Sequence, residues 1–215
     1  MKANLTEIIF ILDRSGFMSG LESDTIGGYN SFLEGQKKVS GEAHVTTVLF
    51  DNLYELLHNG VDIKAVKAIT QREYYARGST ALLDAIGKTI MEVGQRLNNT
   101  VESEKPSKVI FIITTDGEEN SSTEFSHKKI NEMISLQQEK YSWEFIFLGA
   151  NIDAAKEAEN LGIKASRSAN YMANPKGTSD MYTVMSENIE SFRNTGEIKE
   201  NWSEDINKNN KKKKR

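Results

Sequence analysis

Four side chains with hard oxygen atoms stand out because each sits next to a segment expected to be a strand or a helix. They are Asp13, Ser15, Thr80 and Asp116. Carboxylates and hydroxyls without His or Cys suit Mg²⁺ or Mn²⁺ rather than zinc or copper. Taken singly, each residue has a simpler explanation as a helix cap or a turn former. Together they predict a divalent-cation site, provided that the fold brings the three segments together.

Three short apolar runs predict the buried strands that must position these side chains. They are rich in Ile and Phe, end in polar or Gly-rich residues, and lie at residues 8–12, 108–114 and 143–149. Near-continuous apolarity is typical of parallel strands that are covered on both faces. A longer run at 43–60 predicts a hairpin with its turn at residues 51–52, and therefore an antiparallel edge.

Amphipathic segments alternate with these strands. One apolar stripe with helical spacing runs through residues 82–97, and Ser122 or Thr123 is expected to cap a helix ahead of the third apolar run. A last helix is expected to begin at Ser179–Asp180. The alternation predicts an α/β fold, an open sheet with helices on both faces. Ligands bind such sheets beyond the carboxyl ends of the strands, so the four oxygen-bearing residues should converge there.

Length and charge favour one domain at residues 1–196 and a polar, polybasic, disordered tail at 197–215. Residues 207–215 hold five Lys and one Arg of the 27 basic residues, which leaves 21 against 31 acidic ones, a net charge of −10. An acidic body argues against nucleic-acid binding by the folded part. The basic end could contact an acidic partner, including another copy of the chain. Without cysteine, a signal-like segment or an apolar run long enough to span a membrane, the expectation is a soluble cytoplasmic protein.

Three motifs in combination resemble the metal-ion-dependent adhesion site (MIDAS) of a von Willebrand factor A (VWA) domain, as found in stand-alone bacterial and phage members. The resemblance covers roughly residues 5 to 195. Its motifs are Asp13-x-Ser15, Gly78-Ser79-Thr80 and Thr115-Asp116-Gly117. It implies a Rossmann-like, doubly wound, mostly parallel six-stranded sheet with one antiparallel edge strand. It also implies a protein-binding or scaffolding module without enzymatic activity.

The resemblance assigns a role to each candidate ligand of a Mg²⁺ or Mn²⁺ ion. It implies that Ser15 binds the metal directly and that Asp13 and Asp116 act largely through water. Thr80 would bind directly or through water, depending on the state of the site. A protein partner would complete the site with a Glu or Asp side chain.

Phe17 departs from the family pattern Asp-x-Ser-x-Ser, in which the second Ser supplies a metal-binding oxygen. Three interpretations remain open: metal binding is lost, it persists weakly with a water in the vacant position, or Phe17 is an exposed apolar anchor for a partner. Weakened or absent metal binding is the favoured one, since even the loss of an outer partner costs about 10–100-fold in affinity.

An enzymatic alternative is a Mg²⁺-dependent phosphohydrolase similar to haloacid dehalogenases, with Asp13 as the nucleophile. That family uses Asp-x-Asp, whereas this chain has Ser15 at the second position. A nucleotide-binding Rossmann domain is disfavoured, because no G-x-G-x-x-G motif follows the first strand.

Overall fold

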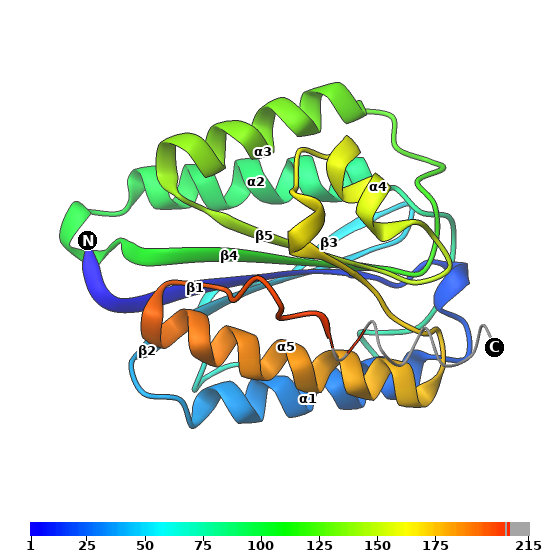
Figure 1. Ribbon diagram of the computed structural model, residues 1–215, viewed down its shortest axis with the longest axis horizontal. Helices are drawn as coiled ribbons and strands as arrows, with labels where there is room; N and C mark the ends of the chain where they lie inside the picture. Colours follow the sequence, from blue (N-terminus) through cyan, green and yellow to red (C-terminus); the bar gives the residue numbers. More distant parts are fainter. Residues whose placement is uncertain (205, 207–215) are drawn as a thin grey trace.

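Within residues 1–204 and 206, which the computed structural model describes, six strands form one central sheet (Figure 1). The strands are β1 (Lys2–Asp13), β2 (Glu42–Phe50), β3 (Tyr54–Asp62), β4 (Pro106–Thr115), β5 (Glu144–Gly149) and β6 (Ser168–Asn170). Their order is β3-β2-β1-β4-β5-β6, with β3 antiparallel to β2 and every other neighbouring pair parallel. This confirms the predicted fold class, including the hairpin edge and the adjacency of β1 and β4.

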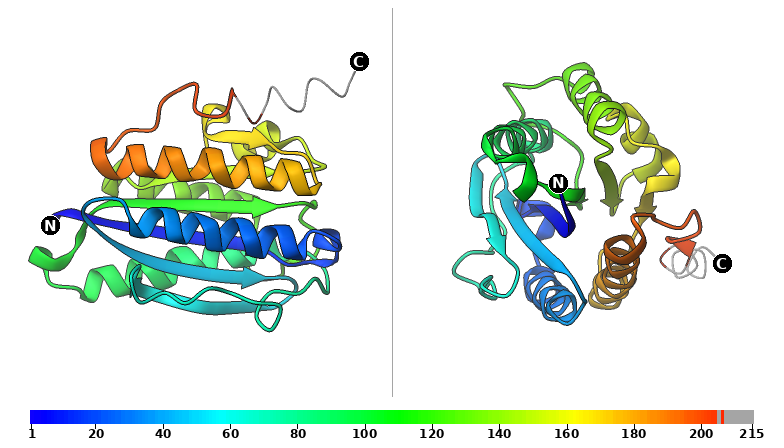
Figure 2. Two further views of the ribbon diagram at one scale, coloured as in Figure 1. Left: turned by 90° about the horizontal axis from the view of Figure 1, so that it is seen from below. Right: turned by 90° about the vertical axis from the view of Figure 1, so that its left-hand side faces the viewer.

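Helices cover both faces of the sheet (Figure 2). α1 and α5 pack together on one face, and α2, α3 and α4 lie on the other (Figure 1). The helices are α1 (Glu22–Lys37), α2 (Leu82–Asn99), α3 (His127–Tyr141), α4 (Ala154–Asn160) and α5 (Pro175–Thr195). None of the described helices is long and apolar enough to cross a membrane.

The apolar run of β1 is continuous because both of its faces are buried. Ile8 and Phe10 belong to the core beneath α1 and α5, whereas Ile9 and Ile11 belong to the core beneath α2 and α3. Side chains of a strand alternate between the two faces, so a strand covered on both sides needs apolar residues at every position.

Two helix starts differ from the sequence prediction. The N-cap of α3 is Ser126 rather than Ser122 or Thr123, because the Ser122 hydroxyl is bonded to Glu119. α5 begins at Pro175, earlier than Ser179–Asp180, with the Asn174 side chain accepting a hydrogen bond from the backbone at the first turn. Pro in the first turn is favourable, since its missing N–H would be unpaired there.

The packed body extends past the predicted boundary at residue 196. Ile198, Trp202 and Ile206 are buried in the core cluster on the α1 and α5 side. The Trp202 indole N–H also donates to the Ser166 carbonyl at 2.8 Å. Ile198, Trp202 and Ile206 therefore pack with the domain, whereas residue 205 and the polybasic segment at 207–215 lie outside the described residues.

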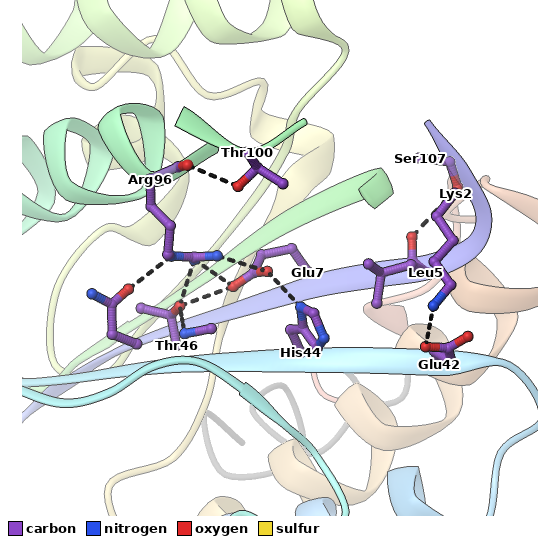
Figure 3. Close-up of polar contacts among 11 residues, drawn as sticks. Lys2, Leu5, Glu7, Glu42, His44, Thr46, Arg96, Thr100 and Ser107 are labelled. Atoms are coloured by element: carbon purple, nitrogen blue, oxygen red, sulfur yellow. Dashed lines mark hydrogen bonds and ion pairs between the residues drawn. The ribbon is translucent and has the colours of Figure 1, made fainter. Parts of the chain in front are cut away.

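A buried ion pair fixes α2 against the sheet (Figure 3). Glu7 of β1 is fully buried, and its Oε1 accepts from Arg96 Nη2 of α2 at 2.7 Å and from Thr46 Oγ1 at 2.9 Å. Arg96 Nε donates to Asn59 Oδ1 of β3 at 2.8 Å. Because a buried charge is costly unless it is paired, this cluster resists sliding of α2.

Candidate metal site

The carboxyl end of β1 delivers Asp13 and Ser15 to one edge of the sheet, at the right-hand side of Figure 1. Asp13 is fully buried, and its Oδ1 accepts from the Ser15 backbone N–H at 2.6 Å. Its Oδ2 accepts from Thr115 Oγ1 of β4, also at 2.6 Å. The Asp13 carboxylate therefore links the ends of the two central strands, which fixes its orientation.

Hydrogen bonds of the backbone N–H groups join the three predicted segments. Gly16 N donates to the Gly78 carbonyl at 3.1 Å, which ties the first segment to the second. Asn120 N donates to the Thr80 carbonyl at 3.1 Å, and Thr80 N donates to Asn120 Oδ1 at 2.9 Å, which tie the second to the third. Gly78 is required here: its φ is +68°, and a Cβ atom would lie 2.1 Å from Asn52 Oδ1. The fold thus brings together segments that are far apart in the sequence.

The two carboxylates lie in a setting that disfavours their charges. Burial raises the pKa of Asp13, against hydrogen bonds from Thr115 and Ser15 that lower it. Burial raises the pKa of Asp116 to about 6, with a further contribution from the charge of Asp13 and against a hydrogen bond from Asn151. A divalent cation between two such carboxylates would stabilise their charged forms.

Two buried hydroxyls at the same edge have no hydrogen-bond partner among the described residues. They are Ser15 Oγ and Thr80 Oγ1, and both side chains are fully buried. A buried hydroxyl without a partner is costly, so each calls for a ligand that the protein itself does not supply. Within the described part of the chain, no group of three or more His, Cys, Asp and Glu could hold a metal. The two unpartnered hydroxyls and the two carboxylates at this end of the sheet are the kind of oxygen donors that a hard cation prefers.

Phe17 lies beside this site, in a short 3-10 turn at Gly16–Met18. A Cβ atom on Gly117 would be 2.5 Å from Phe17 Cδ2, so the ring rests on the backbone next to Asp116. The side chain is nevertheless 55% exposed. Phe17 therefore supplies no oxygen and presents an apolar ring at the rim of the site.

Solved structures with this arrangement of strands and helices include several von Willebrand factor A domains. The vWF domain of the pili tip protein Mfa5 from Porphyromonas gingivalis matches with a TM-score of 0.61 at 10% identity, over 93% of this chain and 99% of that one. The von Willebrand factor type A protein from Catenulispora acidiphila matches with a TM-score of 0.55 at 15% identity. The match covers 87% of this chain and 42% of that one. The chain has a von Willebrand factor A fold.

A further structure with this VWA fold comes from the mussel byssus. Proximal thread matrix protein 1 matches with a TM-score of 0.62 at 15% identity. The match covers 89% of this chain but only 46% of that protein, so this chain spans less than half of its length. Another structure of the same protein has a zinc-occupied MIDAS motif. No protein-family model matches the present sequence, and no curated protein is significantly similar to it. At these identities the likeness establishes the VWA fold but not a shared function.

A charged network behind the site of this VWA fold was not predicted from the sequence. Arg14, between Asp13 and Ser15, is buried, and its Nε donates to Asp51 Oδ2 at 2.9 Å. Arg77 Nε donates to the same oxygen at 2.7 Å. Asp51 therefore anchors the first and second segments to the hairpin turn. The sequence hinted at this network only by placing Arg14 between two candidate ligands. Its partner Asp51 could not be predicted from that, because the contact requires β1 to lie beside β2.

Two further carboxylates attach the loop after β4 to the start of α2. Glu119 Oε2 accepts from Leu83 N at 2.9 Å, which caps the helix. Asp84 Oδ1 accepts from the backbone N–H groups of Glu124 and Phe125, each at 2.9 Å. These bonds hold the loop that carries Asp116, so the third segment of the candidate site is firmly placed although it lies in a loop.

Proposed function

We propose that this protein is a protein-binding module whose site holds Mg²⁺ or Mn²⁺ through Ser15 and Thr80, with Asp13 and Asp116. The observation that carries the proposal is the pair of buried hydroxyls without partners, beside two carboxyl groups whose pKa values are raised by burial. The MIDAS motif of a protein with the same fold holds zinc, which supports a divalent ion as the ligand. When bound, the ion would supply an electrophilic centre for the carboxylate of a protein partner.

Phe17 weakens the affinity of this site for metal and adds to its affinity for a partner. It offers no oxygen where the family pattern has a second Ser, so an octahedral ion would need a water in that position. Its half-exposed ring, held against Gly117, is a rigid apolar group within reach of anything that approaches the metal. Aromatic residues of this kind carry much of the binding free energy in protein interfaces. The partner would therefore combine a Glu or Asp side chain with a neighbouring apolar group.

Affinity capture with matched variants tests this function. Wild type, Ser15→Ala and Phe17→Ala are immobilised and exposed to an extract of the native host, with Mn²⁺ or with EDTA. We expect a partner that wild type retains in Mn²⁺ and loses in EDTA. Both variants should lose it, while Phe17→Ala keeps the metal affinity of wild type. Capture of the same proteins by all three forms, with or without metal, would contradict the proposal.

A further inference from the structure

A cavity lies between α2 and α3 at the opposite end of the sheet from the metal site. Its volume is about 430 Å³, and it is lined by the last turns of both helices and the first residues of β4. Met1 also lines it, which places it near the N-terminus at the left of Figure 1. Cavities of about 300–1,000 Å³ with apolar walls and a few polar groups are typical sites for small molecules.

Two aromatic rings form part of the wall. The Trp143 ring stacks on Phe111 with centroids 5.4 Å apart, and Phe111 in turn stacks on Phe145 at 4.7 Å. Tyr141 lies 6.3 Å from Trp143, and its side chain is 53% exposed. Trp143 is therefore held rigidly in the core, whereas Tyr141 is half-exposed at the mouth, with Lys140 Nζ 5.2 Å from the centre of its ring.

Three side-chain amides also line the cavity and make no hydrogen bond with any described residue. They belong to Gln95, Asn98 and Gln137. Each amide has two N–H donors and an oxygen acceptor, so together they can bind several hydroxyl groups of one ligand. The lining has two cationic groups, Lys105 and the N-terminal amine of Met1, and both are paired with Glu102, at 3.1 and 3.8 Å. The polar groups that remain for a ligand are thus neutral.

We propose that this cavity binds a neutral, hydroxyl-rich ring such as a pyranose. A pyranose presents an apolar C–H face, which an aromatic ring can cover, and a rim of hydroxyls that amides recognise. A nucleotide fits less well, because its phosphate would need a free cation, and both cationic groups of the lining are already paired with Glu102. A free nucleoside would use the same aromatic wall but has fewer hydroxyl groups for the three amides, so nucleosides serve as the comparators in the test.

The test uses a pair of glycine variants that should leave the fold intact. Gly94 of α2 lines the cavity, and a Cβ atom there would meet no atom within 4 Å. Gly94→Leu therefore fills the cavity while replacing a poor helix former with a good one. Gly27 of α1 has the same open surroundings on the other face of the sheet, so Gly27→Leu is the matched control.

Wild type and both variants are titrated with the methyl glycosides of glucose, galactose, mannose and N-acetylglucosamine, with adenosine and cytidine as comparators. Tryptophan emission reports binding at Trp143, since the second tryptophan, Trp202, lies in the core on the opposite face. We expect at least one glycoside to saturate wild type and Gly27→Leu, with affinity at least about tenfold weaker in Gly94→Leu. Gln137→Ala should lose about tenfold, as expected for one hydrogen bond.

Three results would overturn this inference. They are no saturable change with any glycoside, equal binding by Gly94→Leu and wild type, and saturation by a nucleoside alone. None of them bears on the metal site, which lies at the other end of the sheet.

Discussion

Replacing Asp116 with Asn should stabilise the metal-free protein, and should do so only above the pH at which Asp116 loses its proton. The folded state raises the pKa of Asp116 from 3.8 to about 6 and therefore binds this proton more tightly than the unfolded chain. The contribution of Asp116 to stability is then greatest below pH 3.8 and is lost as the pH rises through about 6. The introduced asparagine carries no charge, so the variant should not show this loss.

The size of the effect follows from the pKa shift. The shift is about two pH units, and each unit corresponds to about 1.4 kcal/mol, which sets a ceiling of about 3 kcal/mol. The new amide keeps an oxygen that can accept from Asn151, but its NH₂ group must also be accommodated. We therefore expect a net gain of about 1–2 kcal/mol at neutral pH, and close to none near pH 3.8.

Urea unfolding in EDTA, followed by circular dichroism from about pH 4 to about pH 8, measures this difference. Glu118→Gln is the control, because it removes an exposed carboxylate from the same loop and should change stability little. Adding Mn²⁺ should stabilise wild type more than Asp116→Asn, since only the folded site binds the ion. A variant that is less stable than wild type at neutral pH, or a gain that does not vary with pH, would refute the reasoning.

Four further substitutions have expected effects on the free energy of unfolding in urea. Asp51→Ala should cost about 2–3 kcal/mol, because Arg14 and Arg77 lose their shared carboxylate while the buried Arg14 keeps its ion pair with Glu55; a loss below about 1 kcal/mol would mean that Glu55 is enough to hold Arg14. Trp202→Ala should cost about 3–5 kcal/mol, and no change in thermal midpoint would show that residues beyond 196 are not part of the core. Gly94→Ala and Gly27→Ala should each gain about 1 kcal/mol, whereas a loss in either would reveal a packing role.

Most of the sheet could be predicted from the sequence, because a short continuous apolar run bounded by polar residues is typical of a buried strand. It did not show β6 in its pattern, since Ser168–Asn170 is only three residues long and has no apolar run. Helix starts were misplaced where a predicted cap had another partner: Ser122 is held by Glu119, so α3 begins later. The packing beyond 196 did leave a signal, because Ile198, Trp202 and Ile206 recur at every fourth position, but the surrounding residues are polar.

The candidate site was predictable to the extent that it follows from topology. Parallel strands present their carboxyl ends at one edge, so Asp13, Ser15 and Asp116 had to converge once β1 and β4 were neighbours. The network of Arg14 and Asp51 was not predictable, because it depends on how far a long side chain reaches across the sheet. The position of the Phe17 ring against Gly117 likewise depends on a turn whose residues have no strong preference.

Calorimetric titration with Mn²⁺ is the most direct test of a metal site that is intact except for the missing oxygen at position 17. Wild type, Phe17→Ser and the double variant Phe17→Ser/Thr80→Ala are compared in the same buffer. We expect Phe17→Ser to bind Mn²⁺ about 10–100-fold more tightly than wild type, and the double variant to lose that gain. Two results would contradict the proposal that the site lacks only this oxygen: equal, tight binding by wild type and Phe17→Ser, or no binding by Phe17→Ser.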